Sequence, residues 1–168
     1  MASVRIVNAS PLILLGKIRR LEFLFVSKPN VIVPETTFGE VASTRLATDL
    51  PGWHRGLPPL AVEADVPVPR EIIRYALDPG ESMVLALALH RRASEDDVEV
   101  VLDDRKGKRV AQALGLDVVG TAGLIIRAKA EGLMPASERV GDVVDQLVRA
   151  GLYLGAKDKA AILEAADE

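Results

Sequence analysis

The chain has 168 residues, of which 49% are apolar and only 4% aromatic, and its formal net charge is −3. This length suffices for one domain with a core, and the composition excludes an intrinsically disordered chain. Because aromatic residues are scarce, the core must be aliphatic, which suits α/β folds whose strands are buried on both faces. The negative net charge argues against nucleic-acid binding through bulk electrostatics alone.

The sequence contains no cysteine, which excludes disulfides and thiolate metal sites. Its longest apolar runs, at residues 11–15 and 83–89, are far shorter than the ~20 residues needed to cross a bilayer. No extended apolar region with a small-residue cleavage site follows Arg5, so no signal peptide is predicted. We therefore expect a cytoplasmic protein without a membrane partner.

The first predicted elements are a strand and a helix. The strand covers residues 4–7 and ends near Asn8. Ser10 is the expected N-cap of the helix over residues 11–18, because Pro11 then takes the first helical position.

A second strand and a Pro/Gly-rich excursion follow. After a short helix at residues 21–25, a buried strand is expected at residues 31–33, and Pro34 opens the next helix. Residues 51–69 hold seven prolines and glycines and predict an irregular excursion with a short strand at residues 60–62.

The second half repeats the alternation of strand and helix. Strands are predicted at residues 98–102 and 117–119, with a short edge strand at residues 153–154. The expected helices cover residues 70–77, 79–92, 106–114, 121–130, 140–150 and a final segment ending near residue 166. This pattern predicts one α/β domain over residues 1–168, with a parallel sheet covered by helices on both faces.

Oxygen-bearing side chains stand at the edges of these elements. Asn8 ends the first strand, Asp103 and Asp104 end the strand at residues 98–102, and Glu40 and Glu81 lie in helices nearby. Parallel sheets bind ligands beyond the carboxyl ends of their strands, so these side chains are expected to converge. Clustered hard oxygen donors are typical ligands of Mg²⁺ or Mn²⁺. If they do not converge, they are ordinary surface charges.

Several short segments also match a known family in their order and spacing. They are residues 6–13, 33–41, 80–88, 101–105 and 120–121 with the helix that follows. In these segments the chain resembles PIN-domain proteins, and more narrowly a group of short prokaryotic PIN-like proteins related to the VapC-type ribonuclease toxins. The resemblance covers roughly residues 4–150. It implies a three-layer α/β/α sandwich around a parallel sheet.

The resemblance further implies a nuclease that uses Mg²⁺ or Mn²⁺ to cleave single-stranded RNA. Glu40, Glu81 and Asp104 match the acidic catalytic positions, and Asp103 lies beside the last of them. The metal ligands implied are Asn8, Glu40, Glu81, Asp103 and Asp104. Ser10 matches the small hydroxyl residue after the first acidic position. The expected RNA-binding residues are Ser10, Arg105, Lys106 and Arg109.

Asn8 departs from the family pattern, because active PIN nucleases carry aspartate at this position. An asparagine carbonyl can still bind a hard cation, but it brings no charge. Two interpretations follow: a nuclease with weakened metal affinity, or a module that binds RNA or protein and has lost catalysis.

Each of these residues also has a purely structural interpretation. Asp103 and Asp104 suit the cap of the following helix, and Glu81 suits a first helical turn. Asn8 suits an Asx turn, and Glu40 suits a solvated helix position. The basic residues Arg105, Lys106, Lys108 and Arg109 could contact RNA phosphates, although a solvated helix face explains such charges more often.

The partners expected are RNA, a second copy of the chain and a small antitoxin protein. The antitoxin and the dimer are implied by the resemblance. The mean hydropathy of +0.20 independently favours a homodimer, because one domain of this size would leave apolar surface exposed. Residues 51–69 or the carboxyl-terminal helices are the expected interface.

Overall fold

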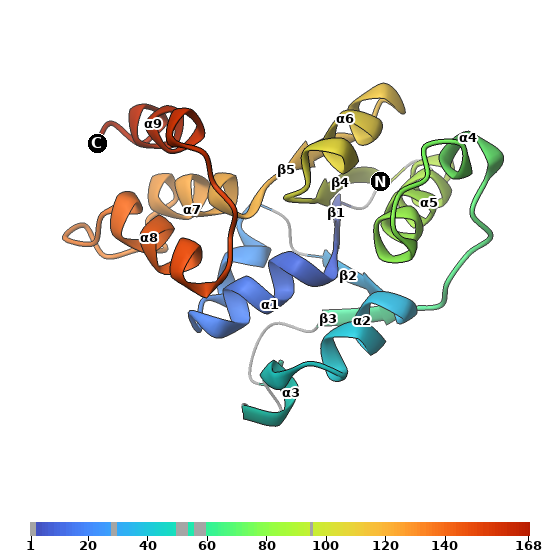
Figure 1. Cartoon of the computed structure of the whole chain (residues 1–168), viewed down its shortest axis with the longest axis horizontal. Coiled ribbons are helices and arrows are strands. Elements are labelled where there is room, and N and C mark those ends of the chain that lie inside the picture. The colour runs from blue at the N-terminus through green and yellow to red at the C-terminus, as the bar shows by residue number, and fades with distance from the viewer. Residues whose placement is uncertain (1–2, 28–29, 50–53, 56–59, 95) are drawn as a thin grey trace.

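A five-stranded, all-parallel sheet lies at the centre of the protein (Figure 1). The computed structural model describes residues 3–27, 30–49, 54–55, 60–94 and 96–168. The strands are β1 (Ser3–Val7), β2 (Asn30–Pro34), β3 (Leu60–Glu63), β4 (Asp97–Val101) and β5 (Asp117–Val119). Their order across the sheet is β3-β2-β1-β4-β5.

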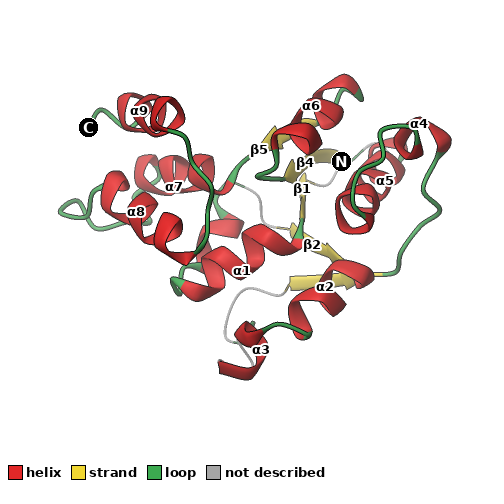
Figure 2. Cartoon of the chain, viewed as in Figure 1, coloured by secondary structure: helices red, strands yellow, loops and turns green. Residues whose placement is uncertain are grey.

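Helices cover both faces of this sheet, which confirms the predicted three-layer α/β/α sandwich (Figure 2). One face packs on α4 (Arg70–Ile73), α5 (Pro79–Ala93) and α6 (Arg105–Ala113). The other packs on α1 (Ala9–Lys17), η1 (Leu21–Phe25), α7 (Thr121–Ala130) and α8 (Val140–Ala150). The remaining helices are α2 (Glu35–Ala42), α3 (Arg45–Asp49) and α9 (Ala156–Ala165). No helix in these described ranges is long and apolar enough to cross a membrane.

The strand order reverses direction between β1 and β4. From β1 the chain moves outward through β2 to β3, and it then returns to place β4 and β5 on the other side of β1. Connections that leave the carboxyl ends of two such neighbouring strands diverge and open a crevice between them. The topology therefore places the ligand-binding position of this fold class directly after β1 and β4.

A buried ion pair joins these two central strands. Arg5 of β1 lies opposite Glu99 of β4, and its Nε and Nη2 donate to Glu99 Oε1 at 2.8 and 2.6 Å. Its Nη1 donates to the backbone oxygens of Leu24 and Val26, so a fully buried guanidinium has partners on each nitrogen. Arg127 of α7 donates to the second oxygen of Glu99 at 2.7 Å. The network ties α7 and the segment after η1 to the centre of the sheet.

Most predicted elements are confirmed, and three details are wrong. Asn8, not Ser10, is the N-cap of α1, because its N–H donates to Val101 O and the chain turns into the helix directly after the sheet. Helix α4 ends at Ile73, since Ala76 adopts a positive φ of 49°. The edge strand at residues 153–154 is absent; this segment leaves α8 through Gly151, whose φ is 121°, and is not part of the sheet.

The predicted Pro/Gly-rich excursion at residues 51–69 is described only in part. Residues 51–53 and 56–59 lie outside the described residues. The short strand expected at residues 60–62 is confirmed as β3, which pairs with β2.

The structure predicts that replacing Arg5 by methionine destabilises the protein by about 3–5 kcal/mol. The buried carboxylate of Glu99 would then lose its pairing with Arg5 and keep only Arg127. Guanidinium chloride unfolding measures this change. Asp145→Asn, which removes an exposed pair with Lys159, is the matched control and should unfold like the wild type. A loss below ~1 kcal/mol for Arg5→Met would contradict a role for the pair in holding β1 against β4.

Candidate functional site

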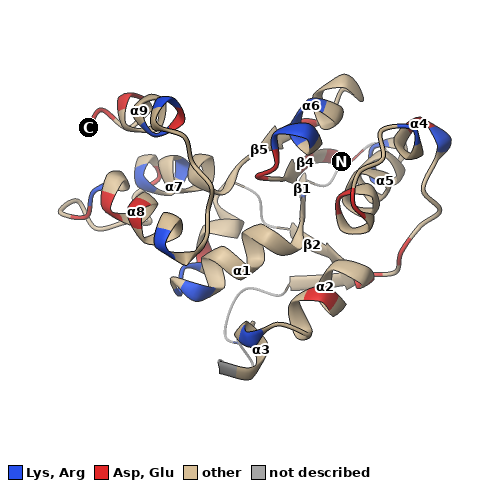
Figure 3. Cartoon of the chain, viewed as in Figure 1, with Lys and Arg blue, Asp and Glu red and all other residues tan. Residues whose placement is uncertain are grey.

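The predicted site residues Asn8, Asp103 and Asp104 lie together beyond the carboxyl ends of β1 and β4. Asn8 follows β1 directly and is held beside β4 by the 3.3 Å bond from its N–H to Val101 O. Asp103 and Asp104 follow β4 after one intervening residue. Figure 3 shows the acidic residues in α2, in α5 and directly before α6, around this end of the sheet. The expected convergence at the strand ends is therefore present in the backbone.

Glu40 approaches the same position from α2. Gly80, in the first turn of α5, marks the place: a Cβ there would lie 3.0 and 3.2 Å from the carboxylate oxygens of Glu40 and 3.3 Å from Asn8 Oδ1. The absence of a side chain at Gly80 thus leaves room for both groups. Glu40 and Asn8 lie next to one another at the start of α5.

Asp78 is a member of the cluster that the sequence interpretation missed. It is the N-cap of α5, and its Oδ1 accepts a 2.8 Å hydrogen bond from the N–H of Glu81. Its negative charge raises the pKa of both Glu40 and Glu81, second in each case to burial. The signal was present in the sequence, because Asp-x-x-Glu before an apolar run has the spacing of a capping box.

Glu81 is the most buried of these carboxylates, with only 6% of the residue exposed. Burial, followed by the negative charges of Asp78 and Asp104, raises the pKa of Glu81 to about 7. A Cβ at Gly107 of α6 would lie 3.1 Å from Glu81 Oε1, so the carboxylate reaches the start of that helix. The pKa of Glu81 therefore lies near neutral pH, mainly because the carboxyl group is buried and secondly because like charges lie beside it.

The carboxylates of the cluster are not ion-paired. Within the described ranges, none of the ion pairs includes a member of the cluster, whose acidic residues are Glu40, Asp78, Glu81, Asp103 and Asp104. Carboxylates that are close together and not paired with a basic side chain form an environment that favours a bound cation.

The two neighbouring aspartates make different contacts. Asp104 is the N-cap of α6, and its Oδ2 accepts a 2.9 Å hydrogen bond from Gly107 N–H. Asp103 turns to α7, where its Oδ1 accepts from the N–H of Thr121 at 2.8 Å and its Oδ2 accepts from Thr121 Oγ1 at 2.6 Å. The expectation that both cap the following helix is right for Asp104 and wrong for Asp103, which fixes α7 to the end of β4.

Two hollows open onto the cluster and share Asn8, Ser10 and Asp78. The first, of about 450 Å³, is also lined by Glu40 and by residues of α1. The second, of about 360 Å³, is lined by Glu81, Asp103, Asp104 and Lys106. Asn8 therefore stands between Glu40 on one side and the pair of Glu81 and Asp104 on the other.

The donor set fits a hard divalent cation in chemistry, although its members are not drawn together into a ligand shell. Among the residues that the structure describes, no three His, Asp or Glu side chains are close enough to hold a metal ion. The available donors are all oxygens, most of them from carboxylates, which are the ligands that Mg²⁺ and Mn²⁺ prefer. Asp103 fits least well, because both of its oxygens are occupied by Thr121.

The predicted RNA-contacting residues are placed unequally. Ser10 is exposed and lines both hollows. Lys106 lines the second, with its Nζ donating to Ala76 O at 3.2 Å. Arg105 is exposed and pairs with Asp158 of α9. Arg109 is exposed and is absent from the linings of these two hollows.

Comparison with known families identifies the fold. The sequence model of the family DUF3368, described as a PIN domain, matches residues 4–168. The chain belongs to this PIN-domain family. No curated protein matches the chain significantly in sequence. PIN domains are a nuclease-like family that binds nucleic acid and generally uses divalent metal ions, so this membership supports the nuclease-like character expected from the sequence. The more specific relation to VapC-type toxins stays a prediction.

The raised pKa of Glu81 predicts a pH-dependent stability. Because the folded state holds the proton more tightly than the unfolded state, stability falls as the pH rises from about 4.5 through about 7. Glu81→Gln removes this charge. In chelator-treated protein, the free energy of unfolding of the variant relative to the wild type should therefore rise by about 1–2 kcal/mol between pH 4.5 and pH 8, after allowance for solvent screening.

Chemical unfolding of both proteins at several pH values measures this difference. Asp145→Asn is again the control, because its carboxylate lies on α8 and is only partly buried. If the difference in unfolding free energy between Glu81→Gln and the wild type stays constant across the pH range, the pKa of Glu81 is not raised.

Proposed function

We propose that this protein is a metal-dependent endoribonuclease that hydrolyses phosphodiester bonds of single-stranded RNA. The observation that supports it most is the set of carboxylates, none of them ion-paired among the described residues, that gather around Asn8 at the carboxyl ends of β1 and β4. Membership of the PIN-domain family supports the same activity.

In this proposal Glu81 and Asp104 are the main ligands of Mg²⁺ or Mn²⁺, with Asn8 beside this pair and Glu40 on the other side of Asn8. The bound ion would lower the pKa of a water molecule and offset charge on the reacting phosphate. Glu40, Glu81 and Asp104 are the proposed catalytic residues. Asp103 would act indirectly, because its contacts with Thr121 hold the neighbouring Asp104 in place.

The alternative is a PIN-like module that binds RNA or protein and has little or no catalytic activity. Two observations favour it: Asn8 supplies no charge at a position where active nucleases carry aspartate, and Asp103 has both oxygens engaged. The two functions differ in whether the carboxylates take up a divalent ion.

The partners proposed are RNA, a second copy of the chain and a small antitoxin, with the protein acting in the cytoplasm as the toxin of a toxin–antitoxin pair. These follow from the family resemblance. The large apolar side chains that are most exposed within the described ranges lie on separate elements: Val62, Ile73, Leu133, Val148 and Tyr153.

The first prediction is that the purified protein cleaves a mixed-sequence single-stranded RNA in the presence of Mn²⁺. Asp104→Asn should lower the rate of RNA cleavage by about 100-fold or more, because it removes a charged metal ligand. The amide retains an oxygen that can accept the hydrogen bond from Gly107, so the start of α6 is preserved. Gel electrophoresis of labelled RNA measures the rate.

Asp145→Asn should cleave RNA like the wild type, since Asp145 lies on α8 and pairs with Lys159 of α9. Equal cleavage by the wild type and Asp104→Asn would mean a contaminating nuclease or another site. If the wild type neither cleaves RNA nor takes up Mn²⁺ in calorimetry, the binding-module alternative replaces the proposal.

The second prediction is that Asn8→Asp tightens the binding of Mg²⁺ or Mn²⁺, by about tenfold, because it adds a carboxylate between Glu40 and Glu81. Titration calorimetry measures the affinity. Asn30→Asp is the matched control, because Asn30 is the only other asparagine of the chain and lies exposed at the start of β2. Unchanged affinity in Asn8→Asp would remove Asn8 from the ligand set.

A further inference from the structure

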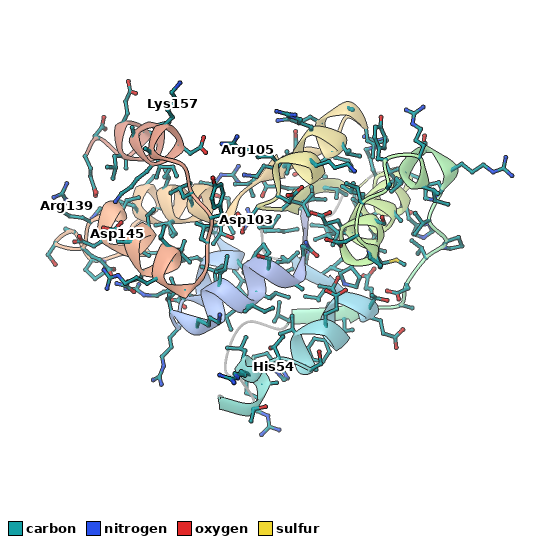
Figure 4. The ribbon with its side chains drawn as sticks, in the orientation of Figure 1. His54, Asp103, Arg105, Arg139, Asp145 and Lys157 are labelled. Carbon is teal, nitrogen blue, oxygen red and sulfur yellow. The ribbon has the colours of Figure 1, made fainter. Side chains whose placement is uncertain are left out.

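A third and larger hollow begins at the two aspartates and runs away from the cluster. It has a volume of about 830 Å³ and lies between α6, the start of α7, α9 and the segment of residues 151–155. Asp103 and Asp104 line both this hollow and the second one, so the two hollows adjoin at the aspartates. In Figure 4, Asp103 and Arg105 lie between α6 and the segment that joins α8 to α9. We call this hollow the carboxyl-terminal groove.

The groove has two basic side chains close to the aspartates. Arg105 and Lys108 both come from α6, which places them on one wall. The side chain of Arg105 is 71% exposed. Lys108 Nζ lies 2.7 Å and Asp103 Oδ1 lies 3.2 Å from where a Cβ of Gly120 would stand, so the cation reaches the floor of the groove. These positive charges lie beside the proposed cleavage site, where phosphates of a bound strand would pass.

The opposite wall carries an aromatic ring in an unusual position. Tyr153 is 89% exposed, more than any other large apolar or aromatic residue among those described as exposed. Its neighbours are anchored, because Leu152 is buried and Leu154 packs against the core, while Leu152 N–H donates to Leu147 O at 2.9 Å. The ring is therefore presented to the groove by a fixed backbone. Exposure of a large ring costs free energy unless a partner covers it.

An exposed ion pair crosses the groove at the same place. Arg105 Nη2 lies 2.7 Å from Asp158 Oδ2 of α9, and about half of the Asp158 side chain is exposed. Pairs of this kind are weak in water and exchange readily. A phosphodiester carries the same single negative charge as Asp158, and its two free oxygens can accept from the guanidinium in a bidentate way, whereas Asp158 accepts through one oxygen. In the free protein Arg105 is therefore paired with Asp158, and a phosphate of the RNA can take the place of Asp158.

We propose that the carboxyl-terminal groove binds single-stranded RNA, with a base stacked on Tyr153 and phosphates held by Arg105 and Lys108. Asp158 competes with the RNA for Arg105 and so weakens binding. This inference rests on the proposed function, since it supplies the path by which a strand reaches the carboxylates. It assigns to Tyr153, Lys108 and Asp158 roles that neither the family resemblance nor the cluster implies.

The chemistry favours a single strand over a duplex. Stacking on an isolated ring requires a base that is free of its own neighbours, whereas a duplex presents mainly its backbone. The net charge of −3 leaves little general attraction for nucleic acid, so binding must depend on local contacts such as these. A combination of a few basic side chains with an exposed aromatic ring is typical of single-strand binding surfaces.

The test is fluorescence anisotropy with a labelled, mixed-sequence single-stranded RNA of about 12 nucleotides, in a chelator-containing buffer of about 50 mM salt. Tyr153→Ala should weaken binding by roughly 5- to 30-fold, because one stacked base is lost. Tyr153→Phe should bind within about twofold of the wild type, because the ring is kept. Asp158→Asn should tighten binding by about two- to fivefold, because Arg105 is released.

Asp145→Asn is the matched control for Asp158→Asn: it breaks another exposed pair involving α9, between Asp145 and Lys159, outside the groove lining, and should bind RNA like the wild type. Equal binding by Tyr153→Ala and the wild type would overturn the proposal, as would equal affinity of Asp158→Asn and Asp145→Asn. If the wild type binds no RNA, the proposal is also overturned, and a protein partner becomes the ligand to test for the groove.

Because the chelator prevents cleavage, this experiment separates the two proposals. Binding with the expected pattern, but no cleavage after Mn²⁺ is restored, would reject the proposed nuclease and retain the groove. Cleavage that is unaffected in Tyr153→Ala and Asp158→Asn, with unchanged RNA affinity, would retain the nuclease and reject the groove.

Discussion

The pairing of β1 with β4 is the constraint on which the rest of the protein depends. Arg5 and Glu99 are directly opposite in the parallel register, and both are buried. A shift of one residue would place Arg5 beside a valine and leave two buried charges without their partners, at a cost of several kcal/mol. The register is therefore fixed, and with it the spacing between Asn8 and the two aspartates that follow β4. A polar interaction on one face of the sheet thus determines the geometry at its carboxyl edge.

Three helices begin at that edge, and two of them begin with negative charge. Asn8, Asp78 and Asp104 are the N-caps of α1, α5 and α6. Helix N-termini carry partial positive charge, which offsets part of the repulsion among the carboxylates. It does not offset all of it, since the pKa values of Glu40 and Glu81 remain raised. Capping and metal binding are therefore compatible here: Asp104 caps α6 through one oxygen, and its charge still adds to the field around Glu81.

The sequence predicted the fold better than it predicted the roles of neighbouring side chains. Strands such as β2 and β4 are short Val/Ile runs, and burial on both faces leaves them few alternatives. The N-cap of α1 was misplaced because Ser10 and Pro11 match the usual pattern, whereas the turn is set by a bond from Asn8 to another strand. The contacts of Asp103 with Thr121 join residues 18 positions apart, and no local pattern announces them. Long-range contacts of this kind are what single-sequence reasoning misses.

The Asp103–Asp104 pair also explains how one short turn can serve two surfaces. Because Asp103 is held by Thr121 at the start of α7, the backbone there is fixed from the side of the carboxyl-terminal groove. Asp104, one residue later, is fixed from the side of α6 and borders Glu81. The turn therefore forms a rigid boundary shared by the acidic hollow and the groove that carries Arg105 and Tyr153. A strand lying in the groove would meet the carboxylates at this boundary without any rearrangement of the sheet.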